Sequence, residues 1–455
     1  MNDFYVDKVR NYIGGRRVVI LGFGREGKSS LSFFKENLPD IQLVVADRNP
    51  DAFSGFGDSD AEFFPGKDYL DIIKAGDFVM KSPGISFRDF TPPAGVLISS
   101  QTDLFLFLFG NQITGVTGTK GKSTTVTLIH SILSHYFGDV KLVGNIGTPA
   151  LDIAGEIGSE TKVVYELSSH QLEFTGTSPH IAVLLNLFEE HLDHYKGYES
   201  YRNAKWQIAA HQDEDDFFVY NACDDTLSAD MEKTGRGRGR RIAVSVGCDS
   251  AAGVFFDGSE IFFNGKSLGF QRERFKPAGD HNVFNLMTAL AVAGISGIDA
   301  KEALETAYEF GGLPHRLEFV GNYGGIDFYN DSIATIPQAA VNALKTVENV
   351  ATVILGGINR GINYDLLVDY LADSGPLNIM LVGDVGKMLK ERLKAADYKG
   401  RVVFHECFDE AVRTAVEVTP AGKACLLSPA AASYDKFRNF EERGDRFKEI
   451  VKGKD

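Results

Sequence analysis

Apolar runs of strand length recur along the whole chain, and amphipathic stretches of helical periodicity lie between many of them. This alternation favours an α/β fold with largely parallel sheets, because parallel strands are joined by crossover connections that are usually helices. The predicted strands are residues 17–22, 41–47, 163–167, 181–187, 352–357, 379–384 and 425–429.

The length of 455 residues exceeds what one hydrophobic core usually supports. Two segments are candidate seams: 92-PPAG-95, which runs up to Gln101, and 311-GGLPHR-316, which follows a helical pattern at 300–310. They divide the chain into three predicted domains of ordinary size, residues 1–100, 101–313 and 314–455.

Composition excludes several classes of protein. A formal charge of −15 argues against nonspecific nucleic-acid binding, which needs a clustered basic surface. The basic stretch 235-GRGRGRR-241 is interpreted as a solvated hairpin loop. Four widely spaced cysteines form no C-x-x-C pair and indicate buried free thiols in a reducing compartment. Because the longest apolar run, 104-LFLFLF-109, is too short to cross a bilayer, we expect a cytoplasmic protein.

The stretch 115-GVTGTKGKST-124 follows a predicted strand and leads into a predicted helix. It is similar to a nucleotide-binding P-loop, although Val116 stands where the usual spacing has its first glycine. Backbone N–H groups at the start of this helix would face phosphate oxygens, and the helix dipole would favour the negative charge. Lys122 would reach the β- and γ-phosphates and the Ser123 hydroxyl would bind Mg²⁺, which predicts an ATP site.

A second glycine motif lies near the N-terminus. Gly22, Gly24 and Gly27 have the G-x-G-x-x-G spacing between a strand and a helix, and Asp47 ends the next strand. Spacing and context match a dinucleotide-binding fingerprint. The same geometry can bind the diphosphate of any nucleotide-linked substrate, so the motif predicts a diphosphate site more securely than a nicotinamide site.

Acidic and imidazole side chains end two further predicted strands. Glu166 ends one, and Glu189, Glu190, His191 and Asp193 follow another. Because the carboxyl ends of parallel strands converge on the ligand crevice, this pattern favours a metal beside the ATP phosphates.

Nine motifs in order carry a family resemblance. They are GTKGKST, GNIGTP, ELSSHQLE, NLFEEHLDHY, YRNAK, GDHNVFN, GLPHRLE, NDSIAT and SPAAASYDKFRNFEERG. Together they resemble the Mur ligase family along nearly the whole chain, and the last motif is similar to the branch that adds D-glutamate. The resemblance implies three domains: a Rossmann-like N-terminal domain, a central P-loop ATPase-like domain with a mostly parallel sheet, and a Rossmann-like C-terminal domain.

The resemblance also implies an ATP-dependent amide ligase of peptidoglycan synthesis. It would add D-glutamate to UDP-N-acetylmuramoyl-L-alanine through an acyl phosphate, as a monomer without nucleic-acid or membrane partners. Family members have a shortened phosphate loop, which accounts for Val116. The implied ATP-binding residues are Gly118, Thr119, Lys120, Gly121, Lys122, Ser123, Thr124, Asn282, Arg316 and Asp331.

Two Mg²⁺ sites, with Mn²⁺ as the alternative ion, are implied at Ser123, Glu166, His191 and Lys205. Lys205 matches a lysine that is carbamylated in the family and so becomes an anion. Lys122, Glu166, His191 and Lys205 are the implied catalytic residues. The UDP substrate would contact Gly22, Gly24, Gly27, Asp47, Ser82 and Asn145, and D-glutamate would contact Thr335, Arg360, Ser433, Asn439 and Phe440.

The chain departs from the family pattern at four positions in or beside these sites. Lys120 replaces the usual asparagine, Glu190 the usual aspartate, and Ile333 and Arg360 replace lysines. Arginine can bind a carboxylate in bidentate geometry, whereas isoleucine cannot replace a cation.

Other interpretations remain open at this point. Addition of L-alanine or of a diamino acid would use the same ATP and metal residues, although the sequence has no D-N-P-R motif associated with diaminopimelate. A folylpolyglutamate synthase would not explain the N-terminal diphosphate motif. A dinucleotide-dependent oxidoreductase fused to a P-loop module would show quenching of NADH fluorescence. A noncatalytic nucleotide-binding regulator would have no evident use for Glu166, His191 and Lys205 together.

Overall fold

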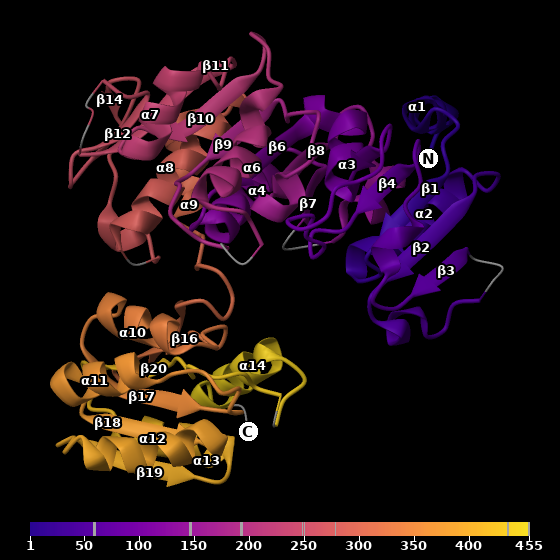
Figure 1. Ribbon diagram of the computed structural model, residues 1–455. Helices are drawn as coiled ribbons and strands as arrows, with labels where there is room; N and C mark the ends of the chain where they lie inside the picture. Colours follow the sequence, from indigo (N-terminus) through magenta and orange to yellow (C-terminus); the bar gives the residue numbers. More distant parts are fainter. Residues whose placement is uncertain are drawn as a thin grey trace. The chain divides into compact units, whose positions relative to one another are not determined.

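The computed structural model describes residues 1–57, 61–144, 148–191, 194–247, 249, 251–277, 279–434 and 436–453. The chain divides into two compact units, one of Met1–Gln271 with His281–Ala307 and one of Arg272–Asp280 with Tyr308–Asp455. The first unit contains two sheets and the second contains one (Figure 1). The domain boundaries predicted after residues 100 and 313 stay predictions.

The N-terminal sheet has five parallel strands in the order β3-β2-β1-β4-β5. The strand order reverses between β1 and β4, and the carboxyl ends of strands at such a reversal flank a ligand crevice. The elements are α1 (Asp3–Ile13), β1 (Val18–Leu21), α2 (Arg25–Asn37), β2 (Leu43–Asp47), η1 (Pro50–Phe53), β3 (Glu62–Pro65), η2 (Tyr69–Ile72), β4 (Phe78–Lys81) and β5 (Leu97–Ser99).

The central sheet has nine strands in the order β14-β13-β12-β11-β10-β9-β6-β8-β7, parallel from β12 to β7 and antiparallel at the β14 end. Its strands are β6 (Ile113–Thr117), β7 (Val140–Gly144), β8 (Lys162–Glu166), β9 (Ile181–Leu184), β10 (Phe217–Asn221), β11 (Arg240–Val246), β12 (Val254–Phe256), β13 (Ile261–Phe263) and β14 (Lys266–Ser267). The helical segments between Gln101 and Ala307 are α3 (Gln101–Phe109), η3 (Gly110–Gln112), α4 (Lys122–Tyr136), η4 (Ala150–Glu156), α5 (Ser169–Leu172), α6 (Tyr198–Ala210), α7 (Asp225–Thr234), η5 (Arg272–Arg274), α8 (Asp280–Ile295) and α9 (Ala300–Ala307).

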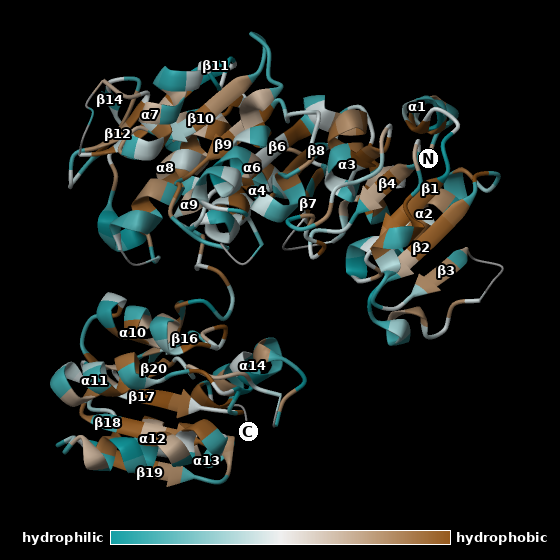
Figure 2. Ribbon diagram, viewed as in Figure 1, coloured by the Kyte–Doolittle hydropathy of each residue, from teal (hydrophilic) through white to brown (hydrophobic). Residues whose placement is uncertain are grey.

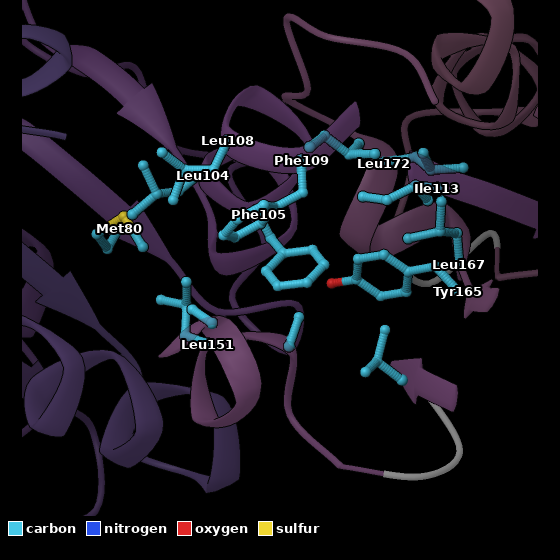
Figure 3. Packing of buried hydrophobic residues seen from close by; sticks show 14 of the residues in the cluster. Met80, Leu104, Phe105, Leu108, Phe109, Ile113, Leu151, Tyr165, Leu167 and Leu172 are labelled. Atoms are coloured by element: carbon cyan, nitrogen blue, oxygen red, sulfur yellow. The ribbon is translucent and has the colours of Figure 1, made fainter. Parts of the chain in front are cut away.

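The two sheets of the first unit share one hydrophobic core. Helix α3 is buried on nearly all sides and links Met80 of β4 to Tyr165 of β8 within that core (Figure 3). Phe105 packs edge-on against Tyr165 with ring centroids 5.8 Å apart. A buried ion pair between the Lys81 ammonium and the Glu173 carboxylate, 3.0 Å apart, adds a polar link. The apolar run at 104–109 is therefore a core helix.

The second unit has a six-stranded sheet in the order β15-β16-β20-β17-β18-β19, parallel except for the β15–β16 pair. Helices cover both faces, and the strands between them are strongly apolar (Figure 2). The elements are β15 (Glu318–Tyr323), β16 (Ile326–Asn330), α10 (Pro337–Thr346), β17 (Val350–Gly356), α11 (Asp365–Ser374), β18 (Asn378–Val382), α12 (Gly383–Ala395), β19 (Arg401–His405), α13 (Phe408–Val418), β20 (Ala424–Leu427) and α14 (Phe440–Val451).

The predicted fold class is confirmed, and every predicted strand is present. Two predictions were wrong. The stretch 235–241 is no hairpin, because it joins α7 to β11 and β11 pairs parallel with β10. The cysteines are not all buried free thiols: Cys425 is, but Cys407 is exposed and Cys223 is disulfide-bonded. Within the described ranges, no helix is long and apolar enough to cross a membrane.

Candidate active site

The phosphate loop lies where β6 passes into α4. Gly121 has a φ of 90°, in the left-handed region, and a β-carbon there would lie 2.7 Å from the side-chain oxygen of Asn285. Lys122 begins α4, and its ammonium donates hydrogen bonds to the carbonyls of Gly118 at 2.9 Å and Thr119 at 3.0 Å. Ser123 and Thr124 follow in the first turn of α4. The predicted loop residues therefore form one cradle at a helix N-terminus.

Helix α6 presents Tyr201 and Lys205 to this loop from positions four residues apart, which lie on one helix face. The Tyr201 hydroxyl lies 2.9 Å from the Thr119 hydroxyl, and the Lys205 ammonium donates to the Gly118 carbonyl at 2.7 Å. Lys205 is only 2% exposed. Burial, followed by the charge of Lys122, lowers the pKa of Lys205 well below that of an ordinary lysine.

Glu166 and His191 flank the loop from neighbouring strands. Glu166 is fully buried at the end of β8, paired in register with Val116 of β6. His191 follows β9 with a left-handed φ of 58°, and its ring lies 4.8 Å from that of His170. Over the part of the chain that the structure describes, no group of three or more His, Cys, Asp or Glu side chains is arranged to hold a metal ion.

Asn282 lies in the first turn of α8 and connects to the loop through Asn285. The Asn285 amide donates to Asn282 at 3.1 Å, and its oxygen accepts from Thr125 of α4 at 3.1 Å. The structure thus brings Asn282 into the same network as the phosphate loop.

The N-terminal glycine motif forms a second cradle at the reversal between β1 and β4. The Ser82 hydroxyl donates to the Gly22 carbonyl at 2.8 Å, and the Asp47 carboxylate accepts from the N–H of Phe23 at 2.6 Å. Gly24 is the N-cap of α2. The predicted diphosphate residues therefore converge. Asn145, which was assigned to the muramoyl part of the substrate, lies outside the described residues. Asp193 lies outside them as well.

Gly27 is the position in this cradle that tolerates a side chain least. A β-carbon there would overlap the Gly22 carbonyl oxygen, because α2 packs directly against the end of β1. We expect Gly27→Ala to destabilise the protein by about 1–3 kcal/mol, measured by chemical denaturation. Gly24→Ala is the matched control, since a β-carbon at Gly24 has nothing within 4 Å. Equal stability of the two variants would contradict this packing.

In the second unit, three neighbouring strands end at one edge of the sheet. Asp331 and Thr335 follow β16, Arg360 follows β17, and Ser433 follows β20. A bridge between Ile358 and Ala432 joins the last two loops. The predicted amino-acid-binding positions on these loops therefore share one edge, where Ser433 is buried and Arg360 is exposed.

Asn439 and Phe440 begin α14. The Asn439 side chain is the N-cap and accepts from the N–H of Glu442 at 2.9 Å. The Phe440 carbonyl accepts from the Ser332 hydroxyl at 2.8 Å. Both residues therefore have structural contacts at the start of this helix. Arg316 is exposed beside the buried Asp331, whose carboxylate accepts from the Ser428 hydroxyl at 2.7 Å.

A model of the Mur ligase middle domain matches residues 116–293. The chain is 32% identical over 447 residues to UDP-N-acetylmuramoylalanine–D-glutamate ligase of Aquifex aeolicus, covering 96% of this chain and 98% of the relative. The ligase of the same name from Streptococcus mutans is 32% identical over 455 residues, with coverage of 96% and 97%. The chain belongs to the Mur ligase family.

Solved Mur ligase structures share the fold at lower identity. MurF from Acinetobacter baumannii superposes with a TM-score of 0.59 at 18% identity, covering 84% of this chain and 92% of that one. UDP-N-acetylmuramate-alanine ligase MurC from Thermotoga maritima gives a TM-score of 0.54 at 20% identity, covering 96% and 100%. MurF from Thermotoga maritima in complex with ADP gives 0.56 at 15% identity, covering 100% and 99%.

The donor set of this Mur ligase fits a hard divalent cation beside a nucleotide. Ser123 supplies a hydroxyl at the helix N-terminus, and Glu166 supplies a buried carboxylate on the adjacent strand. Mg²⁺ prefers oxygen ligands and usually keeps several waters and substrate phosphates, so a site with few protein ligands suits it. A dense cluster of carboxylates and imidazoles is not required.

Three residues that support the candidate sites were not predicted from the sequence. Two of them contact the phosphate loop and one lies in the second unit. Asn186 accepts from the N–H of Lys120 at 2.8 Å and donates to the Lys120 carbonyl at 3.0 Å, which anchors the phosphate loop. Tyr201 contacts Thr119 of the loop. Arg443, only 2% exposed, donates hydrogen bonds to Ser332 and Ala431 at the edge of the sheet in the second unit. A polar residue within the apolar stretch 181–187, as Asn186 is, was the one available signal.

Asp331 gives a prediction with a defined pH dependence. Burial raises the pKa of Asp331 to about 7, although the bonds from Ser428 and the Leu317 N–H and the charge of Arg316 favour the ionised form. The stability contributed by the neutral carboxyl is fully present below its unfolded pKa of 3.8 and is lost as the pH rises through about 7. We expect Asp331→Asn to be more stable than the parent near pH 8 and equal to it near pH 4, measured as melting temperature. A difference independent of pH would contradict the raised pKa.

Proposed function

We propose that this Mur ligase joins D-glutamate to UDP-N-acetylmuramoyl-L-alanine at the expense of ATP. Similarity over nearly the full length to ligases of that name carries the proposal. The buried Lys205 and Glu166 on either side of the Lys122 loop give it a structural basis. Because ATP and a nucleotide-linked sugar are cellular substrates, we place the enzyme in the cytoplasm. We also propose that it is a monomer.

In the first step, the carboxylate of the alanyl substrate attacks the γ-phosphorus of ATP and ADP leaves, which gives an acyl phosphate. The N–H groups at the start of α4 and the Lys122 ammonium offset the charge that gathers on the transferred group. Bound Mg²⁺, with Mn²⁺ as the alternative, supplies further positive charge on the phosphate oxygens. Ser123 and Glu166 would hold one ion, and His191 with a carbamylated Lys205 would hold the second.

In the second step, the amine of D-glutamate attacks the acyl carbon, and phosphate leaves as the amide forms. Arg360 is exposed on its loop and would bind a carboxylate of the incoming amino acid in bidentate geometry. Thr335 and Ser433 lie on adjacent loops of the same edge and would add hydrogen bonds. Asn439 and Phe440 are assigned a supporting role, because the Asn439 side chain caps α14.

The nucleotide and the UDP substrate use the remaining loops. The family resemblance assigns Asn282 to ATP, and it assigns Arg316 and Asp331 to the nucleotide as well. The cradle of Gly22, Gly24 and Gly27, with Asp47 and Ser82, would hold the uridine diphosphate.

The proposal is tested by phosphate release from Mg·ATP with UDP-N-acetylmuramoyl-L-alanine. D-glutamate, L-glutamate, L-alanine, L-lysine and meso-diaminopimelate are added one at a time, and the product is identified by mass spectrometry. We expect turnover with D-glutamate alone and a product heavier by one glutamyl residue. Turnover with another amino acid would show that the enzyme adds that amino acid in place of D-glutamate. Ile333 and Arg360 would then be the first residues to substitute.

A further inference from the structure

Two departures of this chain from the family pattern form a single contact. Lys120, where the family usually has asparagine, donates from its ammonium to the Glu190 carboxylate at 2.6 Å. Glu190, where the family usually has aspartate, directly precedes His191. The loop therefore has one cation more than the family pattern, and this cation is paired with a glutamate, whose side chain is longer than that of the usual aspartate.

The Lys120 side chain can change partner without moving the loop. Asn186 bonds both the N–H and the carbonyl of Lys120, and the Asn186 carbonyl accepts from the N–H of Thr119 at 3.0 Å. The Lys120 side chain itself is 70% exposed, whereas that of Glu190 is 33% exposed. An exposed ion pair of this kind is weak, so a stronger anion can displace the carboxylate.

Two side chains flank the Glu190 carboxylate. One of its oxygens lies 2.6 Å from the Lys120 ammonium, and the other lies 3.9 Å from Nε2 of His191. The Glu190 carboxylate therefore acts as a counter-anion for the loop lysine and lies directly beside the His191 ring.

We propose that Lys120 exchanges the Glu190 carboxylate for a nucleotide phosphate when nucleotide binds, which releases Glu190 beside His191. Glu190 then competes with the nucleotide for Lys120, and the two residues have opposite effects on nucleotide affinity. This inference rests on the proposed nucleotide site and assigns to Glu190 a role in setting its affinity.

The test is the dissociation constant of ADP, measured by calorimetry in EDTA so that no metal contributes. Lys120→Asn is expected to weaken ADP binding about three- to tenfold, because one charge-assisted contact to phosphate is lost. Glu190→Gln is expected to tighten binding about threefold, because Lys120 no longer has to leave a carboxylate. In the Lys120→Asn background, Glu190→Gln is expected to change the affinity less than twofold, since no lysine remains to be released.

Glu199→Gln is the matched control, since it removes the same charge from an exposed residue in the first turn of α6 and should leave the affinity unchanged. A Glu190→Gln gain that persists in the Lys120→Asn background, or that Glu199→Gln reproduces, would show a general effect of the net charge and overturn the exchange. Weaker binding by Glu190→Gln would overturn it as well. Absence of ADP binding by the unmodified protein would instead overturn the proposed nucleotide site.

Discussion

Replacing Lys205 with arginine is expected to lower the rate of phosphate release by a factor on the order of 10³. The Lys205 amine is buried and bonded to the Gly118 carbonyl, and its pKa lies well below the usual value. A neutral amine can attack CO₂, forming an N–C bond and losing a proton, and the carbamate that results is an anion among cations. Arginine keeps its charge at any ordinary pH and cannot make this group.

The carbamate has a readout apart from activity. With ¹³C-labelled bicarbonate, we expect a carbamate resonance from the unmodified protein and none from Lys205→Arg. Lys196→Arg is the matched control, because Lys196 is exposed and the substitution is chemically the same. If Lys205→Arg kept a tenth of the activity or more, Lys205 would be a packing residue and not a catalytic one.

Arg443→Leu is expected to destabilise the second unit by about 3–5 kcal/mol. The guanidinium is buried and donates to the Ser332 hydroxyl at 3.0 Å, the Ser332 carbonyl at 2.8 Å and the Ala431 carbonyl at 3.1 Å. Leucine would leave these oxygens buried without those donors, and the cost of unsatisfied polar groups adds to the lost bonds. Hydrogen exchange of β16 and β20 peptides would report the change within this unit.

Arg446→Leu is the internal comparison on the same helix. Arg446 pairs with Asp409 at 2.6 Å, but its side chain is 31% exposed, so water can replace the contact. We expect a loss of about 1 kcal/mol or less. Equal losses for the two arginines would show that burial of the Arg443 guanidinium adds nothing.

Local patterns predicted the two glycine loops that we propose bind phosphate. The loop residues are close together in the sequence and form one continuous turn of backbone between β6 and α4. They are Gly118, Gly121, Lys122 and Ser123. The glycine motif at Gly22 was found for the same reason. Every strand predicted from an apolar run is also present in the structure. A strand that is buried between helices on both faces must be apolar at consecutive positions, so it can be recognised in the sequence.

Contacts between distant residues left no comparable signal. Asn186 lies 66 residues from Lys120, so no periodicity links the amide to the loop it holds. Arg443 is charged, and charged residues are rarely fully buried, so its three internal bonds were not foreseeable. Asn439 was assigned to D-glutamate by the family resemblance alone, and its role at the start of a helix was not predicted. The structure shows the capping contact.

The Asn186 amide has a consequence for how this family can diversify. It holds the phosphate loop through the main chain of position 120, so the loop conformation does not depend on which side chain stands there. Selection can therefore change the charge beside the nucleotide by a single substitution, without rebuilding the cradle. A second substitution at position 190 then suffices to rebalance it. Position 120 is thus adjustable because its backbone is held by the side chain of Asn186.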